Sequence, residues 1–411
     1  MDNISSNKSI LGLVITDGVG FRNFVLSEFL NSSIQVFDQV IIFSALPESS
    51  YDDRIAHNVR IIELLDYPEH GSTWFFRKAK EIAHLKNNVA NNFGIQDNLK
   101  TNYSKSKTRR GKLTRFIYKI TEIFHSEEWI HRFYKVQQKS FFKATQTNKY
   151  CELLKSYNPS VLFFTHQRPP HIAPLIYAAS KEGIKTCSFI FSWDNLASKG
   201  RMAGDFDDYL LWSNLMKKEL FQFYRNIVSA QVKVVGTPQF EPYVMEKYKS
   251  SKQEFYERFG LNENNKTICF SCGDVSTSAN DPLYIECIAK AILNYKIETT
   301  INFLVRTSPA EEPVRFQYLE VKYPFIKWNY PKWQQTRVEH SELWSQRVPT
   351  ESDLLDLRMI LEFSDLGINM CSTMSLDFMI FDKPVINPVF GNSENELYDD
   401  QRFLRYAHYE R

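Results

Sequence analysis

Short apolar runs followed by helical patterns organise this chain from its start. Residues 10–16 are apolar almost throughout, as expected of a strand that is buried on both faces of a parallel sheet. The turn 17–23 contains Gly18 and Gly20, and a helical pattern covers 24–30. Strand, glycine turn and helix in this order predict the opening of a doubly wound α/β domain.

The same alternation continues through the first half of the chain, with one long interruption. Strand patterns recur at 39–44, 59–64, 161–165, 186–191, 209–213 and 232–235. Between 72 and 157 these patterns stop, and long helical patterns replace them. We therefore expect an N-terminal α/β domain over 1–243 that carries a helical insertion at about 72–157.

A second α/β series follows a charged helical piece at 244–265, which we interpret as the interdomain connection. Its strands are predicted at 267–271, 301–305 and 366–370, its helices at 284–294, 352–363 and 375–381, and a last strand opens at Pro384. This series predicts a C-terminal domain over 266–411. Because the chain stops soon after the last motif, we expect a trimmed form or a fold that closes in a shorter way.

Polar residues and glycines follow the predicted strands of both domains, and ligands of open α/β sheets bind outside the carboxyl ends of strands. In the first domain these positions are Asp17, Gly18, Gly20, His166, Arg168, Trp193, Asp194, Asn195, Lys199 and Arg201. In the second domain they are Gly273, Asp274, Arg306, Ser308, Ser372, Thr373, Ser375 and Asp377. Two such sets suit a cleft between two doubly wound domains. For the glycine pair of the first turn, a plain tight turn is the alternative, because the full dinucleotide spacing is missing.

The stretch 371–375 places small hydroxyl residues between a predicted strand and a predicted helix. Such a loop points backbone N–H groups and hydroxyls at one spot, and the helix dipole favours an anion there. This pattern predicts a phosphate site.

A basic segment lies inside the helical insertion, where residues 100–112 include many lysines and arginines and no acidic residue. In the adjoining pattern one helix face can hold Phe116, Ile117, Ile120, Ile123 and Phe124. Such a segment can dock on an anionic membrane surface or an anionic acceptor. The alternative is a solvated loop followed by an ordinary core helix.

Composition excludes some classes of protein. The chain has 411 residues, of which 43% are hydrophobic and 24% charged, and this suits a globular protein of two or three domains. Lysine plus arginine (50) nearly balances aspartate plus glutamate (48), so the overall charge does not favour nucleic acid. No apolar run is long enough to span a membrane, and the N-terminus lacks a signal-peptide pattern. We expect a cytoplasmic location, at the inner face of the membrane if 100–124 docks there.

Metal and disulfide chemistry have little support in the sequence. The six cysteines lie mostly in apolar runs, where free cysteine behaves as a small hydrophobic residue. Cys269 and Cys272 form a lone CxxC, which is weak evidence for zinc, and a redox pair is the alternative. The acidic run 205–208 precedes a predicted strand and is poorly placed for a metal. We expect catalysis without a metal or cofactor.

Three motifs of the chain stand in a defined order. They are Val-Gly-Thr-Pro-Gln-Phe at 235–240, Arg-Thr-Ser-Pro at 306–309, and Ser-Asp-Leu-Gly-Ile-Asn-Met-Cys-Ser-Thr-Met-Ser-Leu-Asp at 364–377 before Lys-Pro-Val-Ile. This order resembles the GT-B glycosyltransferases, most nearly the bacterial enzymes of surface-polysaccharide assembly and their glycerophosphotransferase relatives. The resemblance is best over the second domain. It implies two Rossmann-like domains that face each other across a cleft.

The resemblance also implies roles for single residues. The second domain of that family binds a nucleotide-activated donor, so Ser372 and Thr373 would contact its diphosphate. Asp377 stands where many relatives have a glutamate that reaches the donor ribose. Arg306 matches an Arg-x-His-Pro type of loop, but Ser308 replaces the histidine, so a role of that histidine does not transfer.

Glycosyl transfer needs hydrogen-bond donors for the leaving diphosphate, and Arg306, with Lys199 or Arg201, can supply them beside the hydroxyl loop. An acceptor hydroxyl must also lose its proton. The candidate bases, in order of preference, are Asp17, His166 and Asp194. Each has a structural alternative. Asp17 can cap its turn, His166 can form a hydrogen bond to a neighbouring loop, and Asp194 can cap a helix or form an Asx turn.

Together these patterns predict an enzyme that moves a sugar from a nucleotide sugar to a hydroxyl of a glycan or lipid-linked acceptor. The motif at 364–377 and the Lys-Pro-Val-Ile after it contain no Glu-x7-Glu arrangement of the kind seen in many retaining relatives, so the resemblance favours inversion of the anomeric centre. A glycerophosphotransferase or a sugar-nucleotide epimerase is the alternative on the same fold. A two-domain ligand-binding protein without catalysis is the alternative from a different class.

Overall fold

The computed structural model describes residues 8–51, 55–90, 92–142, 144–339, 342–390 and 402–409. They form two compact units. Unit 1 contains Met1–Thr16, Glu28–Thr237 and Arg405–Arg411, and unit 2 contains Asp17–Ser27 and Pro238–Leu404. The expected division at residue 243 differs from these units, because it assumed that each domain is one continuous stretch of chain.

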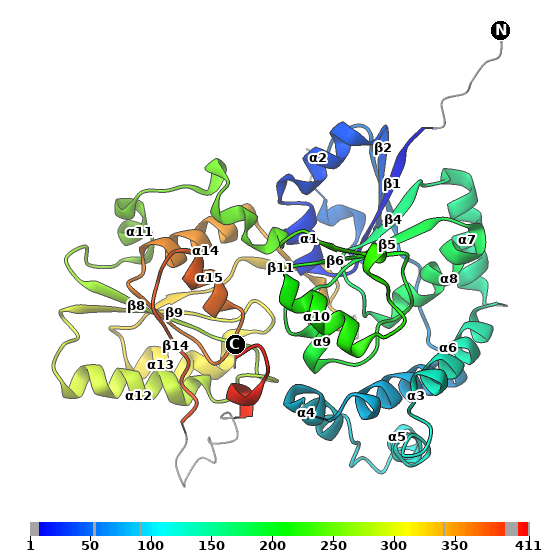
Figure 1. Cartoon of the computed structure of the whole chain (residues 1–411). Helices are drawn as coiled ribbons and strands as arrows, with labels where there is room; N and C mark the ends of the chain where they lie inside the picture. The colour runs from blue at the N-terminus through cyan, green and yellow to red at the C-terminus, as the bar shows by residue number, and fades with distance from the viewer. Residues whose placement is uncertain are drawn as a thin grey trace. The chain divides into compact units, whose positions relative to one another are not determined.

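A seven-stranded sheet forms the centre of unit 1, in the order β3-β2-β1-β4-β5-β6-β7 (Figure 1). Its strands are β1 (Ile10–Ile15), β2 (Gln39–Ser44), β3 (Val59–Glu63), β4 (Val161–Phe164), β5 (Lys185–Phe189), β6 (Asp208–Leu211) and β7 (Val232–Val234). Every neighbouring pair is parallel. The strand order changes direction between β1 and β4, so the loops that follow these two strands flank the switch point of the sheet.

Helices cover this sheet and fill the predicted insertion. They are α2 (Glu28–Val36), α3 (Gly71–Asn87), α4 (Phe93–Thr101), α5 (Arg109–Ile120), α6 (Glu127–Phe141), α7 (Thr145–Tyr157), α8 (Ala173–Glu182), α9 (Asn195–Ser198) and α10 (Asn214–Phe223). Helices α3 to α7 occupy the chain between β3 and β4, and α3 packs against both α5 and α6 (Figure 1). Gly183, in the left-handed conformation at φ 70°, ends α8.

The predicted helix 24–30 is wrong. Helix α1 (Gly18–Phe24) already begins inside the glycine turn, and α2 begins separately at Glu28. The early start has a local cause, because the Asp17 carboxylate accepts a hydrogen bond from the Gly20 backbone N–H at 2.8 Å and so caps α1.

Unit 2 has a five-stranded parallel sheet in the order β10-β9-β8-β13-β14. Its strands are β8 (Lys266–Ser271), β9 (Ile301–Arg306), β10 (Lys327–Asn329), β13 (Leu366–Ile368) and β14 (Val385–Ile386). β11 (Trp333–Gln335) and β12 (Arg347–Pro349) form a separate antiparallel pair. The sequence patterns do not predict β10, β11 or β12, three short strands that lie in a stretch broken by Pro324, Pro331 and Pro349.

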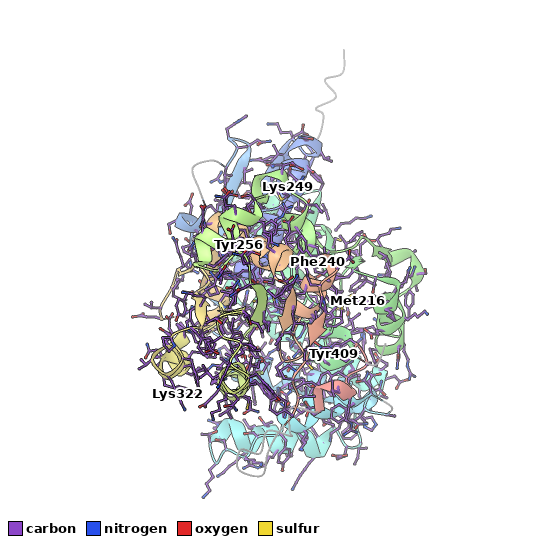
Figure 2. The ribbon with its side chains drawn as sticks, turned by 90° about the vertical axis from the view of Figure 1, so that its left-hand side faces the viewer. Met216, Phe240, Lys249, Tyr256, Lys322 and Tyr409 are labelled. Carbon is purple, nitrogen blue, oxygen red and sulfur yellow. The ribbon has the colours of Figure 1, made fainter. Side chains whose placement is uncertain are left out.

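The sheet of unit 2 is buried on both faces. Its helices are α1, α11 (Lys252–Phe259), α12 (Asp281–Asn294), α13 (Gln317–Lys322), α14 (Glu351–Phe363) and α15 (Met374–Ile380). Phe303 and Val305 of β9 pack in one hydrophobic cluster with residues of α12, while Leu304 packs in another with residues of α11 and α14. Figure 2 draws the side chains as sticks and labels Tyr256, which lies on α11. The predicted α/β class is confirmed.

Candidate functional site

The carboxyl edge of the unit 2 sheet brings together most of the predicted donor-binding residues. Strand order changes direction between β8 and β9 on one side and β13 on the other, so the loops after β8 and β13 flank the switch point. Gly273 and Asp274 follow β8, and Ser372, Thr373 and Ser375 follow β13. These two loops form the candidate site.

Asn369 organises the loop after β13. Its side chain is fully buried, and its Oδ1 accepts hydrogen bonds from the Ser372 backbone N–H at 2.8 Å and from the Ser375 hydroxyl at 3.2 Å. Among the described residues, no group accepts a hydrogen bond from the Asn369 Nδ2. Asn387 supports the same loop, because its Oδ1 accepts from the Cys371 N–H at 3.1 Å.

The hydroxyl residues of this loop divide into two kinds. Ser372 and Thr373 are partly exposed, whereas Ser375 is only 3% exposed and bonds within the loop. Asn369 and Asn387 are not among the predicted site residues, because Asn369 falls inside the predicted strand 366–370 and no end is predicted for the strand that opens at Pro384. The observed strands β13 and β14 end directly before these two asparagines. The loop is therefore a structured turn that presents Ser372 and Thr373.

The loop after β8 is held by its own carboxylates. The Gly273 N–H donates to Asp281 Oδ2 at 2.8 Å, at the start of α12. Asp274 accepts from the Ser276 N–H at 2.9 Å and from the Thr277 hydroxyl at 3.0 Å. The Asp274 carboxylate thus shapes the loop, and the structure gives it a supporting position.

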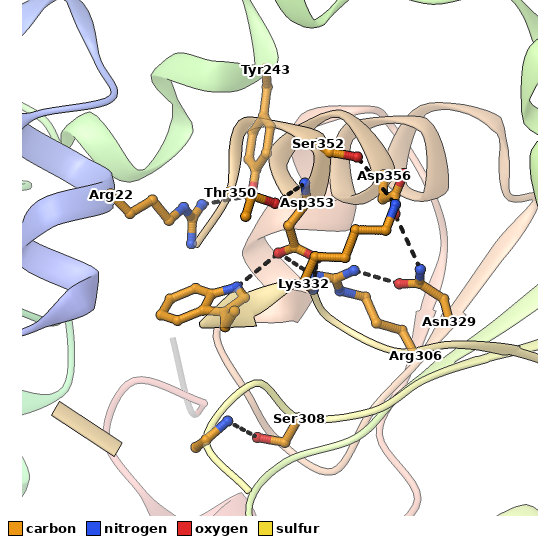
Figure 3. A network of polar contacts seen from close by, with 12 residues as sticks. Arg22, Tyr243, Arg306, Ser308, Asn329, Lys332, Thr350, Ser352, Asp353 and Asp356 are labelled. Carbon is orange, nitrogen blue, oxygen red and sulfur yellow. Dashed lines mark hydrogen bonds and ion pairs between the residues drawn. The ribbon is translucent and has the colours of Figure 1, made fainter. Parts of the chain in front are cut away.

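Arg306 lies in a buried network at the end of β9 (Figure 3). It is 4% exposed, and its Nη2 is 2.8 Å from Asp353 Oδ2, while its Nη1 donates to the Asn329 amide oxygen. Asp353 also accepts from the Trp333 Nε1–H at 2.8 Å and the Lys332 backbone N–H at 2.9 Å. Since the guanidinium is buried against Asp353 and Asn329, the geometry favours a supporting role for Arg306 over the expected contact with a diphosphate.

Burial and charge act in opposite directions on the Asp353 carboxyl. Burial raises its pKa, but the charge of Arg306 and the hydrogen bonds from Arg306, Lys332 and Trp333 together outweigh burial. The pKa of Asp353 therefore lies below its ordinary value, and Asp353 stays ionised beside Arg306.

Asp377 lies in a second buried network, on α15. Its carboxylate is 3% exposed and accepts from the Tyr243 hydroxyl at 2.6 Å and the Gln239 amide at 3.2 Å. Arg22 of α1 donates to the Gln239 backbone carbonyl at 3.0 Å. Burial raises the pKa of Asp377, and the nearby charge of Arg22 offsets only part of this shift. The carboxylate joins α15 to the segment Pro238–Tyr243, to which Arg22 of α1 also bonds, and this placement does not favour the expected ribose contact.

Ser308 also has an internal partner, because its hydroxyl accepts from the Ala310 N–H at 3.2 Å and it is 6% exposed. The predicted residues of the first turn are structural as well. Asp17 caps α1, and a Cβ at Gly18 would come within 1.6 Å of the Arg347 carbonyl oxygen. Gly18 thus allows α1 to pack closely on β12, and Gly20 supplies the capped N–H.

In unit 1 the loops after β4 and β5 are joined by Gln167, which is not among the predicted site residues. Its Oε1 accepts from the Phe191 N–H at 3.1 Å, and its Nε2 donates to Asn195 Oδ1 at 3.2 Å. The His166 ring stacks on Phe191 with 3.9 Å between centroids and is 6% exposed. His166 and Asp194 therefore lie on two loops that are fixed to each other.

Asp194 is bonded within its own loop. It accepts from the Ser192 hydroxyl at 2.7 Å and the Ser198 hydroxyl at 2.9 Å. Burial raises its pKa, but Lys199 and these hydroxyls outweigh burial, so the net pKa is lowered. A carboxylate of lowered pKa is a weak base, and this favours the structural alternative for Asp194. Trp193 beside it packs edge-on against His408, with 4.5 Å between centroids.

Arg201 and Arg168 line two cavities of unit 1. The larger, of about 370 Å³, is lined by Lys80, Glu127, Glu128, Ile130, His131, Tyr134, Arg201, Met202, Gly204, Asp205 and Asn226. Arg201 pairs there with Glu127 at 3.2 Å. Lys80, 2% exposed, donates to the Met202 carbonyl at 2.9 Å, and burial lowers its pKa to about 8. A cavity with these donors and carboxylates can hold a small ligand rich in hydroxyl groups. Arg168 lines the smaller cavity.

Within the described part of the chain, no three His, Cys, Asp or Glu side chains are grouped as metal ligands. The Asp207 carboxylate of the acidic run accepts from the Thr186 N–H at 2.8 Å instead. Cys269 and Cys272 are free and buried, and burial raises the pKa of Cys269 to about 12, so neither redox nor zinc chemistry is favoured there. None of the described helices has the length and apolar character needed to cross a bilayer.

No protein-family model and no curated protein sequence matches the chain. A candidate UDP-N-acetylglucosamine 2-epimerase from Listeria monocytogenes is similar in structure, with a TM-score of 0.50, 10% identity, and coverage of 97% of this chain and 88% of that one. A UDP-GlcNAc 2-epimerase from Neisseria meningitidis has a TM-score of 0.49 and 12% identity, with coverage of 96% of this chain and 89% of that one. A glycosyltransferase from Rickettsia africae has a TM-score of 0.48 and 12% identity, with coverage of 94% of this chain and 81% of that one. At 10% identity the likeness to the Listeria structure concerns the fold alone, and together with the two parallel sheets it confirms the two-domain α/β architecture of the GT-B type that the sequence predicts.

Proposed function

We propose that this chain transfers a sugar from a nucleotide sugar to a hydroxyl group of a glycan or lipid-linked acceptor, without a metal, in the assembly of a surface polysaccharide. The loop after β13 carries the proposal. It lies at the switch point of a parallel sheet, presents Ser372 and Thr373, and includes the buried Asn369 amide, whose Nδ2 donates to no described residue. These groups suit the phosphates of a nucleotide.

The diphosphate of the donor would lie against Ser372 and Thr373, where hydroxyl and amide donors stabilise the negative charge that grows as the sugar leaves. Arg306 would act at a distance. By holding Asp353 and Asn329 at the carboxyl edge it keeps the neighbouring strand ends in place. We assign it a positioning role.

His166 is the best candidate for the base that takes the proton of the acceptor hydroxyl. Imidazole ordinarily titrates near neutral pH, whereas Asp17 caps a helix and Asp194 has a lowered pKa. Stacking on Phe191 fixes the plane of the His166 ring beside the switch point of the unit 1 sheet. We propose direct attack of the activated hydroxyl, with inversion of the anomeric centre.

Binding of the donor is tested by thermal denaturation with UDP, GDP, CMP, CDP-glycerol and dTDP. One of these nucleotides should raise the melting temperature, because a ligand of the folded state stabilises it. The double variant Ser372→Ala/Thr373→Ala should lose most of that rise, while the exposed control Thr299→Ala keeps it. If no nucleotide raises the melting temperature, the proposal fails and a ligand-binding protein of another class is favoured.

Chemistry is tested with the sugar nucleotide of the base so identified. His166→Asn should lower the transfer rate by about 10² or more and keep the thermal shift, while the exposed control His57→Ala keeps both. NMR of the product reports the anomeric configuration. A changed sugar nucleotide in the absence of any acceptor would instead show an epimerase, and release of CMP from CDP-glycerol a glycerophosphotransferase.

A further inference from the structure

The outward face of α5 combines basic and large apolar side chains. Arg109, Lys112, Phe116 and Lys119 follow one another at spacings of three and four residues, which places them on one side of a helix. All four are exposed, and Phe116 is 52% exposed. Ile123, in the turn just after the helix, extends the spacing and is 76% exposed.

The opposite face of α5 is buried, which fixes the direction of the outward one. Thr114, Ile117 and Tyr118 are buried, and α5 packs on α3. The predicted single apolar face is therefore wrong. Phe116 and Ile117 are consecutive, so they point about 100° apart, and only Ile117 enters the core.

Two more lysines stand beside this face, on the loop before α5. Arg115 holds that loop, because its Nη1 donates to the Ser104 carbonyl at 2.9 Å and the Ser106 carbonyl at 2.7 Å. Lys105 and Lys107 are exposed on the loop. The docking face, as we define it, consists of Lys105, Lys107, Arg109, Lys112, Phe116, Lys119 and Ile123.

Charge on this part of the chain has one sign. Between Asp97 and Glu122 the sequence has eight lysines and arginines and no acidic residue, while the whole chain has a net charge of only +2. Glu122 at its end pairs with Lys86 of α3. The partner of the docking face must therefore be anionic.

We propose that the docking face binds the surface of an anionic lipid bilayer. Lysines and arginines would contact the lipid phosphates, and Phe116 and Ile123 would enter the boundary between headgroups and acyl chains. Exposed apolar side chains in line with the cations favour a bilayer over nucleic acid. An isoleucine side chain is stabilised when it enters an acyl layer, whereas it has no aromatic ring on which a base could stack. This inference does not depend on the transfer reaction.

Sedimentation with lipid vesicles tests the inference on the full chain. The protein should bind vesicles of 70% phosphatidylcholine and 30% phosphatidylglycerol at about 0.1 M salt. Binding to pure phosphatidylcholine vesicles should be at least about tenfold weaker, and binding to the anionic vesicles should weaken at about 0.5 M salt. The variant Lys105→Glu/Lys107→Glu/Lys112→Glu should reduce binding at least about tenfold. Phe116→Ser/Ile123→Ser should reduce it severalfold at either salt concentration.

Matched controls carry the same changes elsewhere on unit 1. Lys149→Glu/Lys218→Glu/Lys233→Glu reverses three exposed lysines, and Val36→Ser/Val228→Ser removes two exposed apolar side chains. Both controls should bind like the wild type. Three results would overturn the inference. The charge-reversal variant could bind vesicles as well as the wild type, the controls could lose as much vesicle binding as the variants, or the protein could bind single-stranded RNA and not vesicles. Unchanged binding by the Phe116/Ile123 variant would overturn it as well, since insertion is part of it.

Discussion

Asp353 and Asp377 are two carboxylates of unit 2 that are buried to almost the same extent, at 1% and 3% exposed, yet their pKa values shift in opposite directions. Burial raises both. Asp353 accepts directly from the Arg306 guanidinium at 2.8 Å, whereas Asp377 accepts from the neutral side chains of Tyr243 and Gln239. Direct contact with a cation, rather than burial, decides the direction in which the pKa of each carboxyl shifts.

Arg22 shows why a nearby arginine is not enough. Its guanidinium donates to the Gln239 carbonyl at 3.0 Å and the Tyr243 hydroxyl at 3.4 Å, so its charge reaches Asp377 only through space. The network at β9 is therefore a buried ion pair, and the network at α15 is a set of hydrogen bonds to a carboxyl that is costly to ionise. This difference predicts how each network responds to mutation and pH.

Removal of Arg306 should have the largest effect. Arg306→Ala leaves the Asp353 carboxylate buried without its cation, and we expect the free energy of unfolding of unit 2 to fall by about 3–5 kcal/mol at pH 7. Urea denaturation measures this loss of stability, and Arg225→Ala, at an exposed position, is the control variant. A loss below about 1 kcal/mol would mean that the ion pair does not stabilise the edge of the sheet.

Asp353→Asn should lower the stability at pH 7 by about 2–3 kcal/mol, because the amide still accepts hydrogen bonds but leaves Arg306 without a counter-charge. The pKa of Asp353 is lowered on folding, so its contribution is present above the unfolded pKa and is lost as the pH falls through the folded one. Urea denaturation between pH 7 and pH 3 should therefore show that the difference in stability between wild type and variant becomes smaller as the pH falls. A constant gap would contradict the assignment.

Tyr243→Phe removes the 2.6 Å hydrogen bond to Asp377 and should lower the stability by about 1–2 kcal/mol at pH 8. That bond favours the ionised carboxyl and the pKa of Asp377 is raised, so the loss should become smaller as the pH falls and the carboxyl takes up its proton. Denaturation at pH 4 and pH 8 compares the two states, and an equal loss at both values would show that Asp377 does not titrate in between.

The smallest change is expected for Asp377→Asn. Since the folded pKa of Asp377 is raised, ionisation of this carboxyl opposes folding above the unfolded pKa, and a neutral amide removes that opposition. We expect the stability at pH 7 to change by less than about 1 kcal/mol. A loss as large as that of Asp353→Asn in the same urea experiment would show that the two networks are alike after all.

These networks also show how far sequence reasoning extends. The strand before Ser372, its hydroxyl loop and the helix at 352–363 follow from patterns of a few neighbouring residues, and the structure has all three. The partner of Arg306 lies 47 positions away, and Gln239 lies 138 positions from Asp377. No local pattern links such pairs, so Arg306 and Asp377 looked available for a ligand when each is held by the fold.

The capped helix α1 has a consequence for how the protein can be divided. The backbone leaves unit 1 after Thr16, returns at Glu28, and only later enters unit 2 again at Pro238. A fragment that starts at Pro238 would lack Arg22, expose the Gln239 carbonyl, and leave β12 without the helix that Gly18 packs against it. Unit 2 is thus built from two separate stretches of the chain, and an independently folding piece would need residues 17–27 joined to the fragment.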